Sequence, residues 1–454
     1  MRRAALFFAL ALAAPAAAYA RAGGGGSYSS GSSHSSNSSG SSYSSGSSYS
    51  SGGGYRSSSS GSYGRSTPMS PLEAQLFTGL LVLLVVVLLL VRWLENGPSF
   101  GASRTPAAAA GFAALKTADP SFDEDAFLAR AEAAFRRVQE AWSTGDMTPA
   151  AALLSDGVYE RFQLLLELQR REGRLNKLED LRVNRSVAAD AAPGRRFDAV
   201  DVRFAASCKD RYVSVRDGSL LSEEDSAFVE YWSFVRSASA RGRVSPGAVE
   251  GFCPGCGAAL AVNASAVCPQ CRCWVNSGEF DWVLAEITQE SEWHGTPADS
   301  AQELEDRASM LFWRWQRCLA DKDVAALEGW CSEEGIAALR TSGVGRAAFF
   351  DCGVGAVEAQ VRRSADGFEY APVLVRWAGR EGGPDAPSRK RRTTLTLARR
   401  TGVVSQQNTL LRSAHCAGCG AAIPPAAPVC AHCSLGFKDP AAGWVLVGLE
   451  TFDS

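Results

Sequence analysis

Two sets of four cysteines are the residues whose type and spacing could do chemistry in this chain. The first set is Cys253, Cys256, Cys268 and Cys271, and the second is Cys416, Cys419, Cys430 and Cys433. In each set two CxxC pairs are separated by ten or eleven residues, and a glycine follows the first pair. A CxxC turn aims two thiolates at one ion, so two such turns complete a tetrahedron of sulfur ligands. We therefore predict a zinc ribbon in each set, with two structural zinc ions in all.

Two other uses of these cysteines fit the pattern less well. A disulfide framework requires an oxidising compartment, and a disulfide across a CxxC turn is a redox feature rather than a structural one. A thioredoxin-like role needs one CxxC at the start of a helix instead of paired turns. Because four protein ligands leave a zinc ion no open position, the predicted metal supports folding and does not activate water.

The remaining cysteines and two histidines near the ligands have simpler interpretations. Cys273, His415 and His432 lie beside the predicted ligands and are interpreted as bystanders, although His432 could replace a lost cysteine. Four cysteines without paired spacing are interpreted as small core residues. They are Cys208, Cys318, Cys331 and Cys352.

Little else in the sequence indicates catalysis. None of the four histidines is flanked by a Ser or Cys nucleophile with an orienting acid, and no phosphate loop or dinucleotide fingerprint is present. Glu230 shares one side of the strand-like segment 228–235 with Trp232. It is either paired to an arginine or backbone donor, or it contacts a ligand in a cavity. The basic stretch 388–392 (SRKRR) is interpreted as a solvated hairpin loop, with contact to anionic lipid as the alternative.

The segments before residue 121 have the character of an export signal, a tail, an anchor and a linker. Residues 1–20 carry two arginines, an apolar run and a final Ala-Tyr-Ala, which is typical of a secretory signal cleaved after Ala20. Residues 21–70 are rich in Ser and Gly and are predicted to be disordered. The uncharged run within 72–94 is long enough for one transmembrane helix, and the Gly-, Pro- and Ala-rich residues 95–120 are predicted to be a linker.

The order of signal and span predicts the compartment. A cleaved signal leaves the Ser/Gly tail outside, and the span then stops transfer, which places residues 95–454 in the cytoplasm of a single-pass inner-membrane protein. Four arginines near the span are divided equally between its two sides, so the positive-inside rule does not decide the orientation. Residues 97–454 carry a net charge of −6, and the residues between the cysteine pairs lack Lys and Arg, so no nucleic-acid partner is expected.

The sequence after the linker predicts two copies of one arrangement of elements, in which helices come first and strands follow. A helix is predicted to begin at an N-cap Ser121 with Glu124 three residues on, and alternating residues near 200–204 and 228–235 predict strands. Residues 135–146 match 312–323 at an offset of 177, and each cysteine set precedes a Trp-Val-Leu strand. We therefore predict an α+β fold with an internal duplication. Its copies span 121–290, with ribbon 251–274, and 298–452, with ribbon 414–436.

Three segments of the first copy resemble a known family. They are DPSFDEDAFLARAEAAFRRVQEAWSTGDM at 119–147, EYWSFVR at 230–236 and FDWVLAEI at 280–287. Together with the signal and the span, they resemble bacterial relatives of the mitochondrial import-motor subunit, the Tim44-like family. The resemblance covers 119–290, weakens over the second copy, and does not include the ribbons. It implies a cone-like fold similar to nuclear transport factor two, with helices packed on a curved antiparallel sheet.

The same resemblance implies a function. The mitochondrial relative is a membrane-bound scaffold, so we expect a non-enzymatic adaptor of the inner membrane that holds a protein partner or the membrane surface, with anionic lipid as a candidate contact. The alternative is a small-ligand-binding or enzymatic version of the fold that uses a cavity near Glu230 and Trp232. The sequence does not name the partner.

Overall fold

The computed structural model describes most of the chain after residue 105. The described residues are 106–242, 247–260, 266–296, 301–342, 348–403, 411, 416, 419, 421, 427, 429–436, 440 and 443–453. The predicted signal peptide (1–20), Ser/Gly segment (21–70) and transmembrane helix (72–94) lie outside them. No helix among the described residues is both long and apolar enough to cross a membrane.

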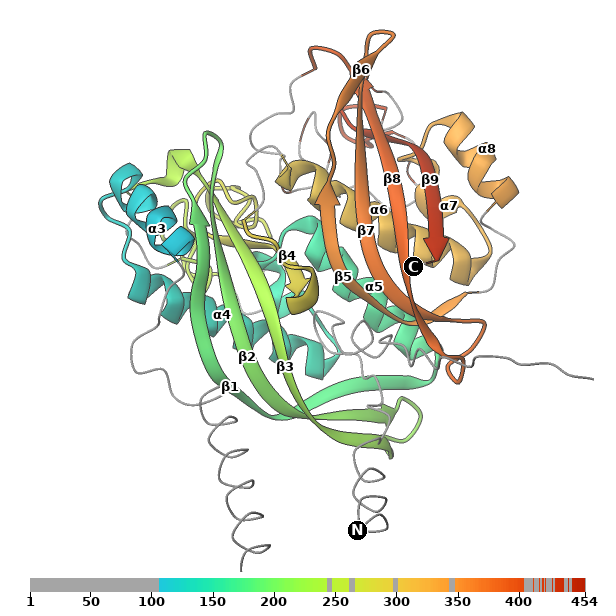
Figure 1. Ribbon diagram of the computed structural model, residues 1–454, viewed down its shortest axis with the longest axis horizontal. Helices are drawn as coiled ribbons and strands as arrows, with labels where there is room; N and C mark the ends of the chain where they lie inside the picture. The colour runs from blue at the N-terminus through green and yellow to red at the C-terminus, as the bar shows by residue number, and fades with distance from the viewer. Residues whose placement is uncertain are drawn as a thin grey trace, which may run out of the picture. The chain divides into compact units, whose positions relative to one another are not determined.

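The first copy is a helix layer on a four-stranded antiparallel sheet (Figure 1). Its sheet has the order β1-β2-β3-β4, so each strand pairs with its neighbour in sequence. The helices are α4 (Glu124–Thr144), the 3-10 helix η1 (Thr148–Leu153) and α5 (Asp156–Arg171). The strands are β1 (Arg174–Ala192), β2 (Phe197–Ser214), β3 (Leu220–Ser237) and β4 (Val283–Gln289). Short 3-10 turns follow β3 (η2, Ala238–Ala240) and β4 (η3, Glu290–Glu292).

Helix α4 shows why this layer forms where it does. Its apolar residues recur on one face and are buried against the sheet, among them Phe135 and Trp142. The predicted N-cap Ser121 is wrong, because the Asp123 side chain accepts the Ala126 N–H at 2.8 Å and Ser121 instead bonds to Asp119. The helix ends at Gly145, whose φ of 76° is a left-handed cap that glycine adopts without strain.

The predicted linker 95–120 is wrong from Pro106 onward. Residues Pro106–Ala118 form helix α3, which packs against β1 through buried Ala108, Phe112 and Leu115. Gly111 permits this contact, since a Cβ there would lie 2.0 Å from the Ala191 carbonyl oxygen. The alanine and glycine content that suggested a flexible linker therefore serves close helix-to-sheet packing.

The second copy repeats the plan. Its helices are α6 (Gln302–Asp321), α7 (Ala325–Glu328) and α8 (Glu333–Ser342). Its strands are β5 (Phe349–Ala359), β7 (Phe368–Glu381), β8 (Ser388–Arg400) and β9 (Val445–Asp453), in the order β5-β7-β8-β9, with the short β6 (Arg363–Ala365) paired to β7. As in the first copy, helices cover one face of the sheet (Figure 1).

Matching contacts support the predicted duplication. Ser155 N–H donates to the Leu284 carbonyl oxygen, and Ser332 N–H donates to that of Leu446, both at 2.9 Å. The two serines are 177 residues apart, which is the offset that the sequence predicted. Each also caps the following helix, since its hydroxyl accepts an N–H three residues later. The α+β class and the two helix-plus-sheet units are therefore confirmed.

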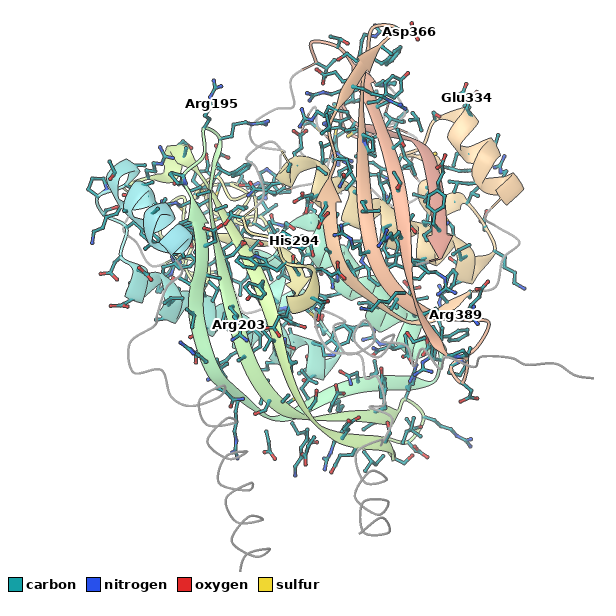
Figure 2. The ribbon with its side chains drawn as sticks, in the orientation of Figure 1. Arg195, Arg203, His294, Glu334, Asp366 and Arg389 are labelled. Atoms are coloured by element: carbon teal, nitrogen blue, oxygen red, sulfur yellow. The ribbon has the colours of Figure 1, made fainter. Side chains whose placement is uncertain are left out.

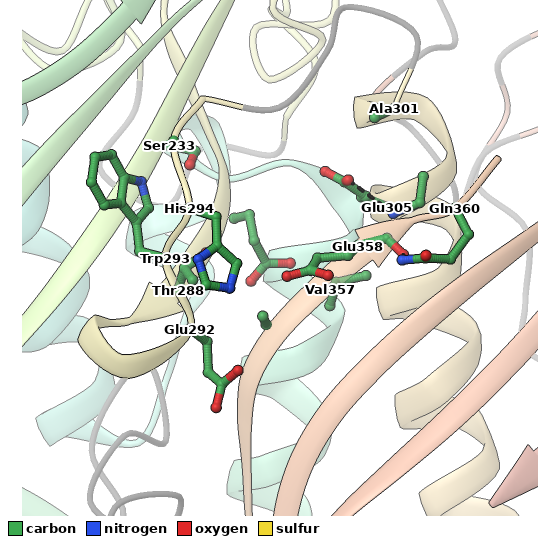
Figure 3. Close-up of a pocket in the computed structure, with 14 residues that line it drawn as sticks. Ser233, Thr288, Glu292, Trp293, His294, Ala301, Glu305, Val357, Glu358 and Gln360 are labelled. Atoms are coloured by element: carbon green, nitrogen blue, oxygen red, sulfur yellow. Dashed lines mark hydrogen bonds between the residues drawn. The ribbon is translucent and has the colours of Figure 1, made fainter. Parts of the chain in front are cut away.

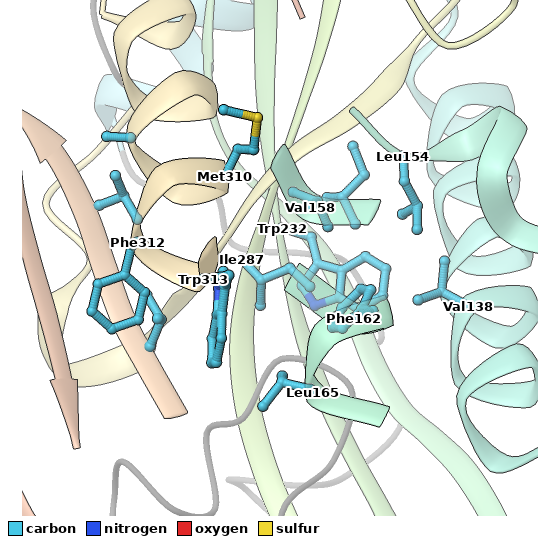
Figure 4. Close-up of a cluster of buried hydrophobic side chains, with 14 of the residues drawn as sticks. Val138, Leu154, Val158, Phe162, Leu165, Trp232, Ile287, Met310, Phe312 and Trp313 are labelled. Carbon is cyan, nitrogen blue, oxygen red and sulfur yellow. The ribbon is translucent and has the colours of Figure 1, made fainter. Parts of the chain in front are cut away.

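The two copies are packed together through helices α5 and α6. Gly157 lies at their crossing, where its N–H donates to Asp306 Oδ1 at 2.7 Å, and a Cβ there would meet the Asp306 backbone oxygen at 2.5 Å. Apolar side chains of both copies meet in one core that includes Phe162 and Trp313 (Figure 4). Leu411, which precedes the second ribbon, is buried with side chains of the first sheet. The chain from 106 onward therefore belongs to one packed unit, as its contacts also indicate.

The basic stretch 388–392 is not the predicted hairpin loop. It begins strand β8, and its residues pair with β7 from Arg380↔Ser388 to Arg376↔Arg392. Arg391 is buried because its guanidinium stacks 4.7 Å from the Phe349 ring and bonds to Glu381. Arg389 is exposed at the hairpin end of the strand (Figure 2). Pairing and stacking thus keep this charged segment in the sheet.

Candidate metal centres

Both cysteine sets lie in the long connection before the last strand of a sheet. The first ribbon follows β3 and precedes β4, and the second follows β8 and precedes β9. Short antiparallel bridges hold the described parts together: Phe252↔Ala259 and Val267↔Trp274 in the first ribbon, and Val429↔Gly436 in the second. Three of the four CxxC pairs, those at Cys253, Cys268 and Cys430, therefore sit in a tight turn enclosed by a bridge among the described residues.

The first set brings four sulfur atoms to one point. Cys253 Sγ lies 3.7 Å from Cys271 Sγ, and Cys256 Sγ lies 3.8 Å from Cys268 Sγ. All four sulfurs are within 4.8 Å of one another. A tetrahedron with metal–sulfur bonds of about 2.3 Å has edges of about 3.8 Å, so the donor set fits zinc. Cys253 and Cys268 are buried, whereas Cys256 and Cys271 face outward.

The second set repeats this geometry. Cys416 Sγ lies 3.5 Å from Cys433 Sγ, and Cys419 Sγ lies 3.5 Å from Cys430 Sγ. The burial pattern is the same, with the first cysteine of each CxxC buried and the second exposed. All eight residues predicted from spacing are thus brought together in two clusters that could hold metal ions, and all thirteen cysteines of the chain are free thiols.

Backbone amides inside the turns point at the sulfurs. Gly255 N–H donates to Cys253 Sγ and His432 N–H donates to Cys430 Sγ, each at 3.4 Å. Backbone amides also lower the pKa of the Cys271 thiol to about 6, the Cys273 amide being the main cause, and that of Cys430 to about 6, where the Cys433 amide dominates. A donated N–H stabilises a thiolate, which is the form that binds a metal.

A residue with positive φ follows the described CxxC turns. Gly257 has a φ of 76° after the first pair, which explains the glycine that the sequence placed there. Arg272 and Ser434 follow the second pair of each set with φ of 61° and 60°. These two residues carry a Cβ in the left-handed region, a conformation that costs about 1–2 kcal/mol for residues other than glycine.

Cys273 is closer to the first cluster than the sequence indicated. Its Sγ lies 3.3 Å from Cys253 Sγ, so it contacts a ligand. Cys273 lies five residues after Cys268. The residue five positions after Cys430, its counterpart in the second ribbon, is Leu435, which packs against the core. His432 is exposed and His415 lies outside the described residues. The four remaining cysteines are buried, as predicted for core residues.

An acid, an arginine and a tryptophan support each ribbon at its base. In the first copy Arg236 pairs across the strands with Asp198 at 3.2 Å and stacks 4.6 Å from the Trp282 ring. In the second copy Arg399 pairs with Glu369 at 2.7 Å and stacks 4.3 Å from Trp444. The sequence pointed to the tryptophans, but only the strand register shows that the arginines and acids correspond.

The first ribbon has an additional link to its helix layer. Arg130 of α4 donates to both carboxylate oxygens of Asp281, at 3.0 and 2.7 Å, and to Glu250 at 2.7 Å. The residue at the equivalent position of α6, Arg307, stacks instead 5.0 Å from the Trp330 ring. Gly443 stands where the first copy has Asp281. The two ribbons are therefore tied to their copies differently.

The predicted ligand cavity near Glu230 and Trp232 is occupied by side chains. Both residues are fully buried, and Trp232 packs 4.7 Å from the Phe135 ring and 5.6 Å from the Phe204 ring. Glu230 accepts the Trp232 indole N–H at 3.1 Å and the Gln289 amide at 3.4 Å. Glu230 is thus a hydrogen-bonded core carboxylate, and the donors shown are the side chains of Trp232 and Gln289 where an arginine or a backbone donor was predicted.

Sequence reasoning missed one cavity in the described part of the chain. It has a volume of about 300 Å³ and lies between β3, β4 and the residues after η3 on one side and α6 and β5 on the other. Four glutamates line it: Glu286, Glu292, Glu305 and Glu358. They are far apart in sequence and come from both copies, so no local pattern could have grouped them.

Fold and site define a class of protein: two helix-on-sheet copies, each carrying a four-cysteine ribbon before its last strand. Residues 108–244 match the family model described as "Tim44-like domain", so the chain contains a Tim44-like domain over that range. This match begins within helix α3, which the sequence had assigned to a linker. It ends before the first ribbon.

Two further comparisons add little. No curated protein matches the chain. The solved structure titled "Ntf2 like protein involved in plasmid conjugation" is 8% identical and covers 56% of this chain and 88% of its own. Its TM-score of 0.14 is too low to support an argument about the fold.

Proposed function

We propose that this chain is a non-enzymatic scaffold of the inner membrane. In this proposal the transmembrane helix predicted from the sequence at 72–94 is the anchor, the Ser/Gly segment lies outside, and residues 95–454 are cytoplasmic. The two copies, each closed by a structural zinc ion, hold a protein partner close to the membrane. A contact with the membrane surface itself is the other outcome that the test below distinguishes.

The observation that carries the proposal is the composition of the two cysteine clusters. Each offers four sulfur ligands, which would fill the coordination sphere of a zinc ion and leave no position for a substrate or water. Zinc held in this way stabilises a fold and supplies no chemistry. The Tim44-like domain over 108–244 is consistent with a scaffold, whose function resides on surfaces.

One hairpin tip offers a surface for such a partner. Three of the seven exposed large apolar side chains of the described residues lie together where β2 turns into β3: Val215, Leu220 and Leu221. The turn between them contains Gly218 with a φ of 72°. Exposed apolar side chains that cluster in this way commonly mark a contact site.

Photo-crosslinking in the native cell tests the proposal at this tip. A crosslinking amino acid at Leu220 of the full-length chain is expected to capture one defined protein, and the same group at exposed Glu334 of helix α8 is the matched control (Figure 2). Capture of lipid from Leu220 would show that the tip contacts the bilayer instead. Equal, diffuse labelling from both positions would contradict a scaffold that uses this tip.

The proposed topology has its own test. A reporter that is active only outside the cytoplasm is fused after Ser454. We expect it to be inactive, because the span stops transfer of the chain. An active reporter would place the cysteine clusters in an oxidising compartment and would overturn both the topology and the case for zinc.

A further inference from the structure

The cavity between the two copies has a strongly acidic lining. Glu305 and Glu358 lie on α6 and β5, and Glu292, Trp293 and His294 lie on the opposite side of the cavity (Figure 3). No lysine or arginine is among the described residues that line it. Its volume of about 300 Å³ is at the lower end of that of small-molecule sites.

Glu286 lines this cavity and has one carboxylate oxygen that is buried and unsatisfied. Its Oε1 accepts hydrogen bonds from buried Arg161 at 3.0 Å and from the Ile287 N–H at 2.7 Å. Its Oε2 has no hydrogen-bond partner among the described residues, although the side chain is only 7% exposed. Leaving a buried carboxylate oxygen unpaired costs free energy that a bound donor would recover.

Glu305 is the second buried carboxyl of the lining. Among the described residues, its carboxyl accepts a hydrogen bond from the Ala359 N–H at 3.1 Å. Burial, together with the nearby carboxylates of Glu286, Glu358 and Asp201, raises the pKa of Glu305 to about 8. At neutral pH this group is therefore mostly protonated until a positive charge enters the cavity.

The surrounding cations do not neutralise the lining. Arg161 approaches Glu286 from α5, and Arg376 of β7 bonds to Glu358 and lies 3.5 Å from Glu292. These two arginines face four glutamates. The acidic side chains also lie too far apart to form a ready metal site, because among the described residues only the cysteine sets bring three ligand atoms within 4.8 Å.

We propose that this cavity binds a small aliphatic amine in its protonated form, with diamines preferred over monoamines. Ammonium groups donate hydrogen bonds to carboxylates, and the unpaired Glu286 oxygen and the Glu305 carboxyl offer acceptors on two walls of the cavity. A diamine can place one ammonium group near each wall. This site is independent of the proposed scaffold and of the cysteine clusters.

Binding of the amine is coupled to proton release. A cation next to Glu305 favours its ionised form, so the proton held at neutral pH leaves as the amine enters. Affinity therefore rises with pH toward about 8 and then levels off, as long as the amine remains protonated. Glu286, Glu292, Glu358 and His294 line the same cavity, and the charges of Glu286, Glu358 and Asp201 act on Glu305.

Isothermal titration calorimetry of the full-length chain tests the site. The probe is 1,4-diaminobutane, and the neutral control is 1,4-butanediol. We expect the diamine to bind at least about tenfold more tightly than the diol, with a net release of protons at pH 7 that appears when buffers of different ionisation heat are compared. Absence of diamine binding, equal binding of the diol, or tighter binding of magnesium ions than of the diamine would overturn the proposal.

Variants locate the binding. Glu305→Gln removes the charge and retains an acceptor for the Ala359 N–H, and it should weaken diamine binding at least about tenfold and abolish the proton release. The matched control is Glu290→Gln, an exposed glutamate near the same loop that does not line the cavity and should leave binding unchanged. If Glu305→Gln fails to fold, Glu358→Gln serves as the second variant. Unchanged affinity in a folded lining variant would contradict the assignment.

Discussion

The two copies share the same four-cysteine cluster but differ in the residues around it. Both keep the four-sulfur cluster and the acid–arginine–tryptophan base below it. In the first copy Arg130 of the helix layer bonds to Asp281, where the second copy has Gly443, and Cys273 contacts Cys253, where the second copy has Leu435 at the equivalent position. Residues that close each ribbon were therefore kept after duplication, while its attachment changed.

A second difference lies where the copies face each other. Glu305, which lines the acidic cavity, stands at the position that Leu128 occupies in the first copy, 177 residues earlier. An ionisable group thus appears in a buried place that exists only because the copies are packed together. The comparison suggests that the ribbons serve stability, whereas the surface between the copies is where a new property can arise.

Removing one metal at a time should have the largest effect. Cys256→Ser disables the first cluster and Cys419→Ser the second, and structural zinc contributes about 10–16 kcal/mol to the folding of isolated zinc fingers. We expect amide protection in the affected ribbon to fall at least about a hundredfold, measured by hydrogen exchange. The loss should be greater in the second ribbon, which lacks the Arg130–Asp281 link.

The control for these variants is Cys208→Ala, a buried cysteine in neither cluster. It should leave the protection of both ribbons intact. Equal protection in the wild type and in both serine variants would show that metal does not hold the ribbons together.

Breaking the arginine link should affect the first ribbon alone. Arg130→Met leaves the Asp281 carboxylate, whose side chain is 10% exposed, without its bidentate partner. Because Arg130 is itself about a quarter exposed, we expect a loss of about 1–3 kcal/mol in unfolding free energy. Zinc release to a chelator should become faster for one of the two ions. The control is Arg136→Met, which breaks the exposed i,i+4 ion pair between Arg136 and Glu132 on the same helix. It should lower the free energy of unfolding by less than about 0.5 kcal/mol.

The free energy of unfolding should depend on pH through Glu305, a group that the first copy replaces with Leu128. The pKa of this group is about 8 in the folded chain and near 4.5 when unfolded, so the native state holds a proton that the unfolded state releases. The stabilisation from this proton is complete below pH 4.5 and is lost as pH rises to 8.

The substitution Glu305→Gln should remove the loss of unfolding free energy that the wild type shows as pH rises from 4.5 to 8. The variant should match the wild type near pH 5 and exceed its unfolding free energy by on the order of 3 kcal/mol at pH 8. Urea unfolding at both pH values measures the difference. A difference that does not change with pH would show that Glu305 is not buried as described.

The smallest effect is expected at the left-handed residues after the second CxxC turns. Arg272→Gly and Ser434→Gly relieve a positive φ and should each stabilise the chain by up to about 1 kcal/mol, as judged from thermal melting. Similar increases in stability at both positions would indicate that the two turns are equivalent. A loss at either one would show that its side chain makes a contact that outweighs the strain.

Local patterns in the sequence predicted a large part of the fold and the metal clusters. The CxxC spacing identified all eight cysteines of the two clusters, because both sulfurs of a pair are fixed by one short turn. Helical periodicity located α4, and alternation located parts of β2 and β3. Strand β1 was not predicted, since it is an edge strand with many charged residues, and its pairing with β2 joins residues from 7 to 40 positions apart.

Features that depend on contacts distant in sequence could not be predicted. Helix α3 looked like a linker because its glycine is explained only by the Ala191 backbone against it. The basic segment 388–392 looked like a loop because Arg391 is buried by stacking on Phe349 from another strand. The acidic cavity combines β4 of one copy with α6 and β5 of the other, which no sequence pattern links.

The number of zinc ions bound per chain tests the central claim most directly. Native mass spectrometry of the full-length chain, purified without added metal, should show two zinc ions, falling to one in Cys256→Ser and to one in Cys419→Ser. Zero or one ion in the wild type, or eight cysteines oxidised in pairs, would contradict the account of two equivalent metal-closed copies.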